Sequence, residues 1–308
     1  MRHGLHHVTA IAGEPRRNLA FYTGTLGLRL VKKTVNFDDP GTYHFYFGDA
    51  TGSPGSIVTF FPWTQAAAGQ NGVGQASETA FRVPESSLGH WAHRLVERGV
   101  AHGSIEKRFG QSVLPFQDAD GMRVALVGVP GAASEPAWAG ADLDAQHALR
   151  GLHGVTLLVE DPGPTAAILT DVLGFRETAR EGLTMRLVAD APLGAVLDLQ
   201  QAQGFLPGRM GRGSVHHIAF RASDDADQAA MATRLLENHG LRTTEQKDRN
   251  YFRSVYFREP NGVLFEIATD GPGFAADEAA DALGRALKLP PFLEPRRREI
   301  EAVLPEVG

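Results

Sequence analysis

Short apolar strands alternate with amphipathic helical stretches along the chain, and the order of these elements repeats. Residues 5–12 read LHHVTAIA and residues 152–159 read LHGVTLLV, so similar strands lie 147 positions apart (residue 5 to residue 152). A proline-containing stretch and a helical pattern with a glycine near its end follow each strand. Self-similarity at a fixed distance is typical of duplicated structural units. We infer that the chain consists of two related halves.

A weaker copy of the same pattern occurs inside each half. Residues 77–83 (SETAFRV) resemble residues 216–222 (HHIAFRA), and both lead into a helical pattern that stops at a glycine, a residue suited to ending a helix. Each copy finishes with a glycine turn and an apolar strand. The unit is therefore a strand, a helix and several strands, present four times. The helical patterns cover 18–30, 88–100, 165–177 and 227–241, and the closing strands lie within 54–62, 120–129, 193–201 and 261–270.

These repeats predict an α+β protein of four βαβββ modules in two tandem halves, with curved mixed sheets around a cleft. Stretches rich in Gly, Ala and Gln separate the modules. The sequence DEAADALGRALKL (277–289) predicts a helix in the tail. The expected bounds are 1–135 for the N-terminal pair of modules (5–63 and 76–130), 150–270 for the C-terminal pair (151–201 and 214–270), and 271–308 for a helical tail.

Composition narrows the class of function. The formal charge of −6 and the scattered Lys and Arg residues argue against a nucleic-acid partner. No apolar run approaches the roughly 18 residues that span a bilayer, and the N-terminus lacks the apolar core of a signal peptide. A cytoplasmic protein without a membrane partner is therefore expected. Because the chain has no cysteine, any metal must be bound by His, Asp or Glu.

Strand alternation places three polar side chains on one face. His7, His217 and Glu266 each lie on the face opposite to the apolar side chains of their strand. If the apolar faces pack against the helices, the three polar groups point into one concave sheet surface. The apolar residues in question are Val8, Ala10, Ile218, Phe220, Phe265 and Ile267.

Alignment of the four copies tests this grouping. In the first strand, the residues that align with His7 are Glu78 in the second copy, Gly154 in the third and His217 in the fourth. In the last strand, the residues that align with Glu266 are Thr59 in the first copy, Ala125 in the second and Asp198 in the third. Only the first and fourth copies together offer two His residues and one carboxylate. They are therefore predicted to share one site, and the second and third copies a degenerate counterpart.

Two His residues and one carboxylate with open positions form the facial triad suited to non-haem Fe(II), although these ligands do not distinguish Fe(II) from Mn(II). The plainer interpretation is that the His-His pairs are polar strand ends and that Glu266 is an exposed carboxylate. Three such residues at repeat-equivalent positions on one face favour the metal site.

Other polar residues carry less weight. His90 and His93 are spaced like ligands on one helix but have no third partner, and Lys32 and Lys33 resemble a solvated charge pair. The lone histidines are interpreted as ordinary packed or exposed residues; these are His44, His102, His147 and His239.

On its motifs the chain resembles the vicinal oxygen chelate superfamily, and more closely the ring-cleaving dioxygenase branch that includes hydroquinone 1,2-dioxygenases. The resemblance covers nearly the whole chain. It implies Fe(II) held in the cleft by His7, His217 and Glu266. The motifs are GLHHVTAI, FYTGTLGLRLVKKTVNFDDPGTYHFYFGD, PGSIVTFFPW, GSVHHIAF, DRNYFRSVYFREPNGVLFEIATD and PPFLEPRR. The resemblance also implies roles around the ligands or against the substrate for His6, Thr9, His216, Arg249 and Tyr256.

The resemblance implies extradiol-type cleavage of a dihydroxylated aromatic ring, with the ring and O2 held side by side at the iron. In this interpretation Tyr256 and Arg249 hydrogen-bond to the ring oxygens or to developing negative charge. His216 or His6 transfers protons, because a near-neutral pKa suits that role. The partners are a small aromatic substrate and O2, and exposed sheet edges favour a homo-oligomer.

Two alternatives use the same fold. A glyoxalase-type metal-dependent isomerase or lyase typically needs a fourth protein ligand, for which Thr59 is a poor substitute. A metal-free small-molecule binding protein is the other alternative, and three intact ligand-type residues argue against it.

Overall fold

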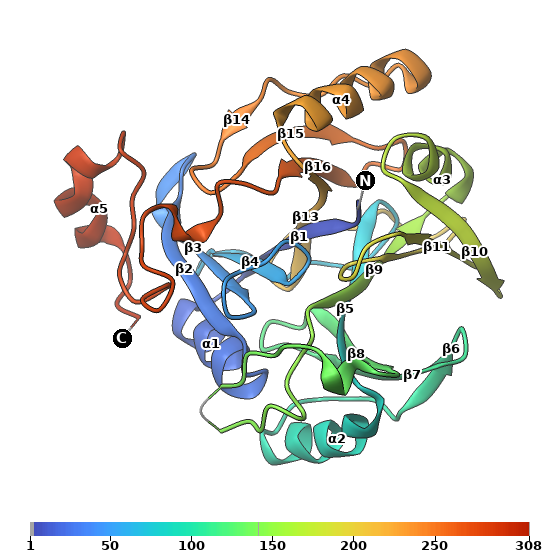
Figure 1. The fold of residues 1–308 in the computed structure, drawn as a ribbon, viewed down its shortest axis with the longest axis horizontal. Helices are drawn as coiled ribbons and strands as arrows, with labels where there is room; N and C mark the ends of the chain where they lie inside the picture. The colour runs from blue at the N-terminus through green and yellow to red at the C-terminus, as the bar shows by residue number, and fades with distance from the viewer. Residues whose placement is uncertain (1–2, 141, 308) are drawn as a thin grey trace.

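The computed structural model describes residues 3–140 and 142–307, and it contains two strongly curved eight-stranded sheets (Figure 1). The first sheet has the strand order β14-β15-β16-β13-β1-β4-β3-β2, and the second has the order β10-β11-β12-β9-β5-β8-β7-β6. The strands of the first sheet are β1 (Leu5–Ala12), β2 (Arg29–Asn36), β3 (Asp39–Gly48), β4 (Ile57–Pro62), β13 (Ser214–Ala222), β14 (Lys247–Asp248), β15 (Arg253–Arg258) and β16 (Leu264–Thr269). Those of the second are β5 (Gln75–Pro84), β6 (Glu106–Arg108), β7 (Gln111–Gln117), β8 (Arg123–Val129), β9 (Leu152–Val159), β10 (Phe175–Glu181), β11 (Thr184–Ala189) and β12 (Val196–Gln201).

The sheets confirm the α+β architecture of four modules in two tandem halves. Antiparallel pairing of β1 with β13 joins the first module to the fourth, and pairing of β5 with β9 joins the second to the third. Each sheet therefore draws its strands from both halves of the sequence. The expected domain bounds stay a prediction, and residues 1, 2, 141 and 308 within them lie outside the described residues.

Strand register confirms the alignment of the four copies. In every module the first strand runs parallel to the last. The residue two positions after the one that aligns with His7 is paired with the residue that aligns with Glu266. A one-residue slip would turn every side chain to the other face, so this shared register fixes which side chains face the cleft. The four pairs are Thr9 with Thr59, Ala80 with Ala125, Thr156 with Asp198, and Ala219 with Glu266.

Helices form near all four predicted stretches and cover the outer, convex faces of the sheets (Figure 1). The apolar strand residues predicted to face them, Phe220 and Phe265 among them, are all buried in one core cluster. The C-cap residue Gly240 has φ +66°, the left-handed conformation that glycine adopts without strain. The helices are α1 (Pro15–Leu19), the π-helical η1 (Ala20–Thr25), α2 (Leu88–Glu97), α3 (Pro162–Asp171), α4 (Asp225–His239) and α5 (Arg297–Val303), with short 3₁₀ turns η2 (Glu85–Ser87), η3 (Ala132–Ser134), η4 (Phe274–Ala276) and η5 (Glu294–Arg296).

The predicted helix over 277–289 is wrong, because this segment consists of turns that lie along β2. Leu287 forms a parallel bridge with Lys33, which an α-helix could not make. Gly284 has φ +78° and lies so close to Leu30 that a β-carbon would be 2.0 Å from the Leu30 carbonyl oxygen. The tail helix is instead α5, further along the chain.

Lys32 is also not solvated, contrary to expectation, because its side chain is fully buried beneath the tail. Its ammonium group lies 2.6 Å from Asp277 Oδ1 and 2.5 Å from Glu278 Oε2, and 4.8 Å from the centre of the Tyr251 ring. The ion pairs therefore fasten the start of the tail to β2.

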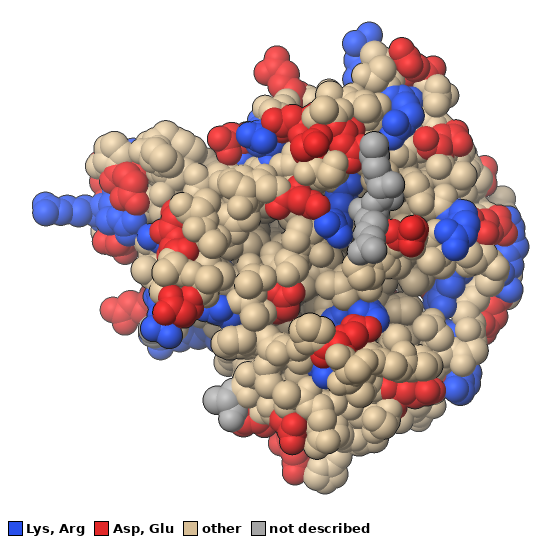
Figure 2. Space-filling view, viewed as in Figure 1, with Lys and Arg blue, Asp and Glu red and all other residues tan. Residues whose placement is uncertain are grey.

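Surface charge is mixed. Lys, Arg, Asp and Glu residues are interspersed on the face in Figure 2, without a large area of one sign. In the described part of the chain, no helix is both long and apolar enough to cross a bilayer.

Substitution of Lys32 by Met is expected to lower the free energy of unfolding by about 3 kcal/mol, because it leaves two largely buried carboxylates without their cation. Urea-induced unfolding measures this change. The control is Lys33→Met, because the Lys33 side chain forms no ion pair with the described residues. Equal losses in the two variants would contradict the buried anchor.

Candidate metal centre

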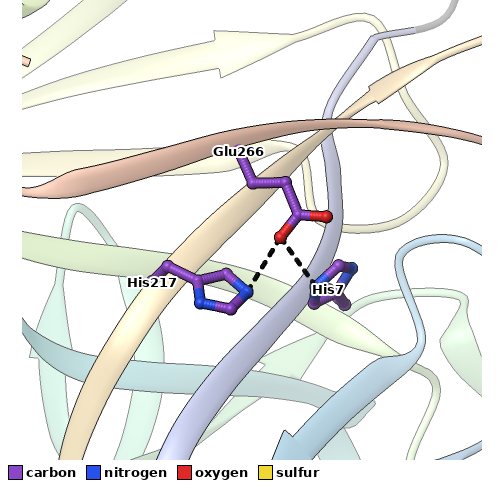
Figure 3. Close-up of side chains that lie close together, drawn as sticks. All are labelled: His7, His217 and Glu266. Atoms are coloured by element: carbon purple, nitrogen blue, oxygen red, sulfur yellow. Dashed lines mark ion pairs between the residues drawn. The ribbon is translucent and has the colours of Figure 1, made fainter. Parts of the chain in front are cut away.

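Three side chains from neighbouring strands of the first sheet converge at its concave face. His7 lies on β1, His217 on β13 and Glu266 on β16 (Figure 3). The Nε2 atom of His217 is 2.8 Å from Glu266 Oε2, and that of His7 is 3.5 Å from the same oxygen. All three side chains are buried, and their candidate ligand atoms lie within 4.8 Å of one another. Among the described residues, this is the one cluster of three His, Asp or Glu residues that comes this close.

The two oxygens of Glu266 have different surroundings. Oε1 accepts a hydrogen bond from the Ser254 hydroxyl, whereas Oε2 is buried and accepts none from the described residues. A buried carboxylate oxygen without a donor is unfavourable unless a cation is present. Two imidazole nitrogens facing this oxygen make a donor set that fits a divalent metal ion.

The histidine preceding each of these two histidines lies behind it. His6 Nδ1 is 2.9 Å from His7 Nδ1, and His216 Nδ1 is 2.7 Å from His217 Nδ1. If Nε2 of His7 and His217 faces the metal, their proton lies on Nδ1 and is donated to His6 and His216. The preceding histidines thus set the ring orientation of both candidate ligands.

Two irregularities in the β1–β13 ladder bring these pairs together. The register jumps between Leu5 and His7, and it jumps again where Thr9 faces His217 and Ala10 faces Val215. His6 and His216 are the residues left without a partner at these jumps. Neighbouring residues of a regular strand point to opposite faces of the sheet. A bulge changes the direction of a side chain, so the rings of two adjacent histidines can come into contact.

Burial and charge favour the protonation states that bind a metal. Burial alone would raise the pKa of Glu266, but His7 and His217 hold that pKa well below its usual range. Burial lowers the pKa of His217 even though Glu266 acts in the opposite direction. Burial also lowers the pKa of His6 far below its usual range and that of His216 to about 3, with the adjacent histidine adding to each shift. An ionised carboxylate and neutral imidazoles are therefore available at neutral pH.

The candidate ligands lie at the floor of a cavity of about 410 Å³. The predicted residues His216, Arg249 and Tyr256 line this cavity, but His6 and Thr9 do not. His6 lies behind His7 and lines a separate hollow, and Thr9 is fully buried. The cavity also has lining residues that the sequence did not single out, including Asn36, Phe37, Asp38, His44, Tyr46, Phe61, Trp63, Thr244, Lys247, Phe252 and Leu264.

His44 is the clearest omission among them. The sequence indicates an ordinary lone histidine at this position, but in the structure the ring is enclosed against the cavity by Tyr46 and Phe61. The register of β3 with β4 pairs Tyr46 with Thr59, so alternation places His44 on the concave face as well. Thr59 aligns with Glu266, and this alignment indicates that Thr59 lies on the concave face. The sequence does not reveal which β3 residues lie beside Thr59, so it does not identify His44.

Arg249 and Tyr256 form one wall of the cavity. Arg249 Nε donates to the Tyr256 hydroxyl at 3.2 Å, and its guanidinium reaches Asp38 at 3.1 Å. Burial and the nearby Glu266 raise the pKa of Tyr256, so the phenol keeps its proton. Burial opposes the charge of Arg249, but Tyr256 and Asp38 raise its pKa overall. This wall offers a fixed cation and a neutral hydroxyl.

The corresponding face of the second sheet holds ion pairs instead. Glu78 lies 2.5 Å from Arg108, and Asp198 lies 2.7 Å from Arg186. Each carboxylate that aligns with a position of the metal centre is thus neutralised by an arginine. This arrangement agrees with the predicted degenerate counterpart.

Substitution of His7 by Ala is expected to weaken zinc or cobalt binding by more than about a hundredfold, because it removes a ligand. His6→Ala is expected to weaken it by roughly ten- to a hundredfold, the usual effect of losing a group that orients a ligand. Competition with a chromophoric chelator measures both. The control is His153→Ala, at the position aligned with His6 in the third copy. Metal loss in that variant, with full binding in His7→Ala, would contradict this ligand set.

Comparison with known proteins places this geometry in a family. The sequence model of the Glyoxalase/Bleomycin resistance protein/Dioxygenase superfamily matches residues 4–126 and 151–267. The chain is 45% identical over 298 residues to the "Putative ring-cleaving dioxygenase MhqO" of Bacillus subtilis (strain 168), covering 97% of this chain and 94% of that protein. It is 33% identical over 306 residues to the chlorohydroquinone/hydroquinone 1,2-dioxygenase of Sphingobium indicum, covering 96% and 94%.

A solved structure extends the likeness to three dimensions. The crystal structure of a "putative dioxygenase" from Bacillus subtilis subsp. subtilis str. 168 has a TM-score of 0.93 and 44% sequence identity, covering 99% of this chain and 98% of that one. The family match spans both halves of the sequence, and the relatives align along nearly all of it. The chain therefore belongs to the Glyoxalase/Bleomycin resistance protein/Dioxygenase superfamily.

Proposed function

We propose that the protein is a non-haem Fe(II)-dependent ring-cleaving dioxygenase of the extradiol type, acting on a hydroquinone- or catechol-like ring. The observation that carries this proposal is the cluster of two histidines and one carboxylate on the floor of a cavity with aromatic walls. The names of the relatives support the same activity. The proposal takes iron as the metal, because a facial triad with open positions suits Fe(II) oxygenases.

The cavity suits a small aromatic substrate. Its volume of about 410 Å³ is at the lower end of the usual range for ligand sites, about 300–1,000 Å³. Phe61, Trp63 and Phe252 supply apolar walls, and the ring of Tyr256 lies 5.8 Å from that of the candidate ligand His217. Apolar walls with a hydroxyl group beside the candidate ligands match a ring that carries hydroxyl groups.

The protein groups have distinct tasks around such a substrate. Bound iron would lower the pKa of a ring hydroxyl and supply the site for O2 activation. The Tyr256 hydroxyl and the Arg249 guanidinium are placed to hydrogen-bond to ring oxygens and to stabilise negative charge. His216 lines the cavity wall, but burial lowers its pKa to about 3, and burial also lowers that of His6 well below its usual range. The near-neutral pKa on which a proton-transfer role for these histidines was predicted is therefore absent, and His216 contributes a neutral imidazole to the wall.

The structure gives reasons to prefer this activity to the two alternatives. A glyoxalase-type site needs a fourth ligand, but the Thr59 hydroxyl is already engaged by His44 and Thr9. In a metal-free binding protein, the buried Glu266 Oε2 would have no donor among the described residues beyond the two imidazoles that face it. Both observations favour three protein ligands and open positions for reactants.

The anaerobically Fe(II)-loaded protein is expected to consume one O2 per ring when it is mixed with a panel of catechols and hydroquinones. An oxygen electrode and the absorbance of the ring-opened product measure the reaction. Metal-free protein and His7→Ala protein are the controls. Absence of O2 uptake across the panel, together with isomerisation of a hemithioacetal, would overturn the oxygenase assignment.

Arg249→Met is expected to lower kcat/KM by about a hundredfold, because it removes a preorganised cation from the reacting ring. Tyr256→Phe is expected to have a similar but smaller effect. Steady-state O2 uptake measures both. The matched control is Arg253→Met, since Arg253 lies nearby on β15 but pairs with Asp225 away from the cavity. A loss in the control equal to that in Arg249→Met would argue against a direct role.

A further inference from the structure

Phe252 lies between two hollow spaces in the first half of the molecule that carries the candidate ligands. One is the cavity above these ligands, and the other is a second hollow of about 260 Å³. Among the residues that the structure describes, Phe252 is the one that lines both. The two spaces therefore adjoin at this residue. The other lining residues of the second hollow are His6, Tyr251, the turn 51–54 between β3 and β4, and residues 270 and 272–275 after β16.

The ring of Phe252 packs against two adjacent histidines that line different spaces. Its centre lies 5.1 Å from the ring centres of both His6 and His7. His7 lines the cavity, whereas His6 lines the second hollow. The Phe252 side chain is only 3% exposed, and it has no polar atom that could bind a metal or donate a hydrogen bond. Any effect of this side chain on a ligand therefore comes from the space that it fills.

The backbone beside this ring is held from two sides. The Arg249 N–H donates to the Phe252 carbonyl at 2.9 Å. The Gly273 N–H donates to the Tyr251 carbonyl at 2.8 Å. The Tyr251 hydroxyl donates to Asp277 at 3.0 Å, and Asp277 also pairs with the buried lysine of β2. The turn before β15 and the start of the tail are therefore fixed to each other, and this keeps the ring in place between the two spaces.

A substituted ring would meet this wall. In the proposed function, the hydroxyl groups of the substrate lie beside the candidate ligands, so a substituent on the ring extends towards one of the cavity walls. In the direction of Phe252 the wall is a single residue, and unfilled space lies beyond it. One aromatic side chain thus decides whether a bulky substituent finds room on this side of the cavity.

We propose that Phe252 limits the size of the ring that the protein accepts, by closing the cavity against the second hollow and excluding diols with a bulky apolar substituent. This inference rests on the proposed function, because it takes the ligand to be a dihydroxylated aromatic ring. It assigns to Phe252 the selection between unsubstituted and substituted members of that class.

Binding of matched pairs of diols tests this selection without turnover. Hydroquinone is compared with phenylhydroquinone, and catechol with 3-phenylcatechol, by calorimetric titration of the zinc-loaded protein without O2. The wild-type protein is expected to bind each phenyl-substituted diol at least about tenfold more weakly than its parent, because even one methylene group changes discrimination in a close-fitting pocket by about ten- to two-hundredfold.

Phe252→Ala is expected to reduce this preference by at least about tenfold, because the surroundings of a large-to-small substitution relax only partly and the space left joins the second hollow. Phe252→Leu is expected to change the preference in the same direction by a smaller factor, and it provides the test if Phe252→Ala does not fold. Competition with a chromophoric chelator establishes that each variant is fully loaded with zinc before the titration.

Phe274→Ala is the matched control. Phe274 is also 3% exposed and belongs to the same apolar cluster as Phe252, but it lines the second hollow and not the cavity. Its substitution enlarges the second hollow and leaves the ring of Phe252 in place. Phe274→Ala is therefore expected to keep the wild-type preference for the unsubstituted diols.

An unchanged preference in the Phe252 variants, or an equal change in Phe274→Ala, would overturn the proposal. Wild-type protein that binds the phenyl-substituted diols as tightly as their parents would also overturn it. Failure of the proposed function has a different signature, because the Fe(II)-loaded wild-type protein would then consume no O2 with the unsubstituted diols, whatever the preference of the variants. Absence of any diol binding by the wild-type protein would overturn both.

Discussion

The antiparallel contact between β1 and β13 is the interaction on which the metal centre depends. It joins the first and last modules, so His7 and His217 face one cavity, and β16 adds Glu266 from the other side of β13. The two bulges in this ladder also place His6 and His216 behind the candidate ligands. One strand interface therefore sets the position of the metal-binding groups and the orientation of their rings.

Burial of charged groups is the second determinant of the candidate site, and the two sheets accommodate their buried carboxylates in different ways. In the first sheet, neutral imidazoles surround a single ionised carboxylate, and the charge of that carboxylate remains available to a cation. In the second sheet, Glu78 and Asp198 are each neutralised by an arginine of the protein itself. The two sheets share one architecture but differ at a few aligned positions. The first sheet therefore carries the candidate metal site, and the second carries internal ion pairs.

The sequence was sufficient to predict the modules, their pairing and the three convergent side chains, because these features follow from periodicity and from the fourfold repeat. It was insufficient where the outcome depends on contacts between segments without a repeat partner. The bulges at His6 and His216 arise from the register between distant strands. The burial of Lys32 and the absence of the helix over 277–289 both result from the tail lying along β2. His44 was missed because its neighbour Thr59 is known only from the β3–β4 ladder.

The separation of the ligands along the chain affects how the protein is made. Glu266 emerges from the ribosome 259 residues after His7 (266 minus 7). The second and third modules are complete earlier, and β5 and β9 contact each other without help from the fourth module. Chains fold progressively from the N-terminus during synthesis. The edge of β1 that pairs with β13 therefore stays unpaired until β13 has left the ribosome. The set of three candidate ligands is consequently complete only after β16, which carries Glu266, has been synthesised.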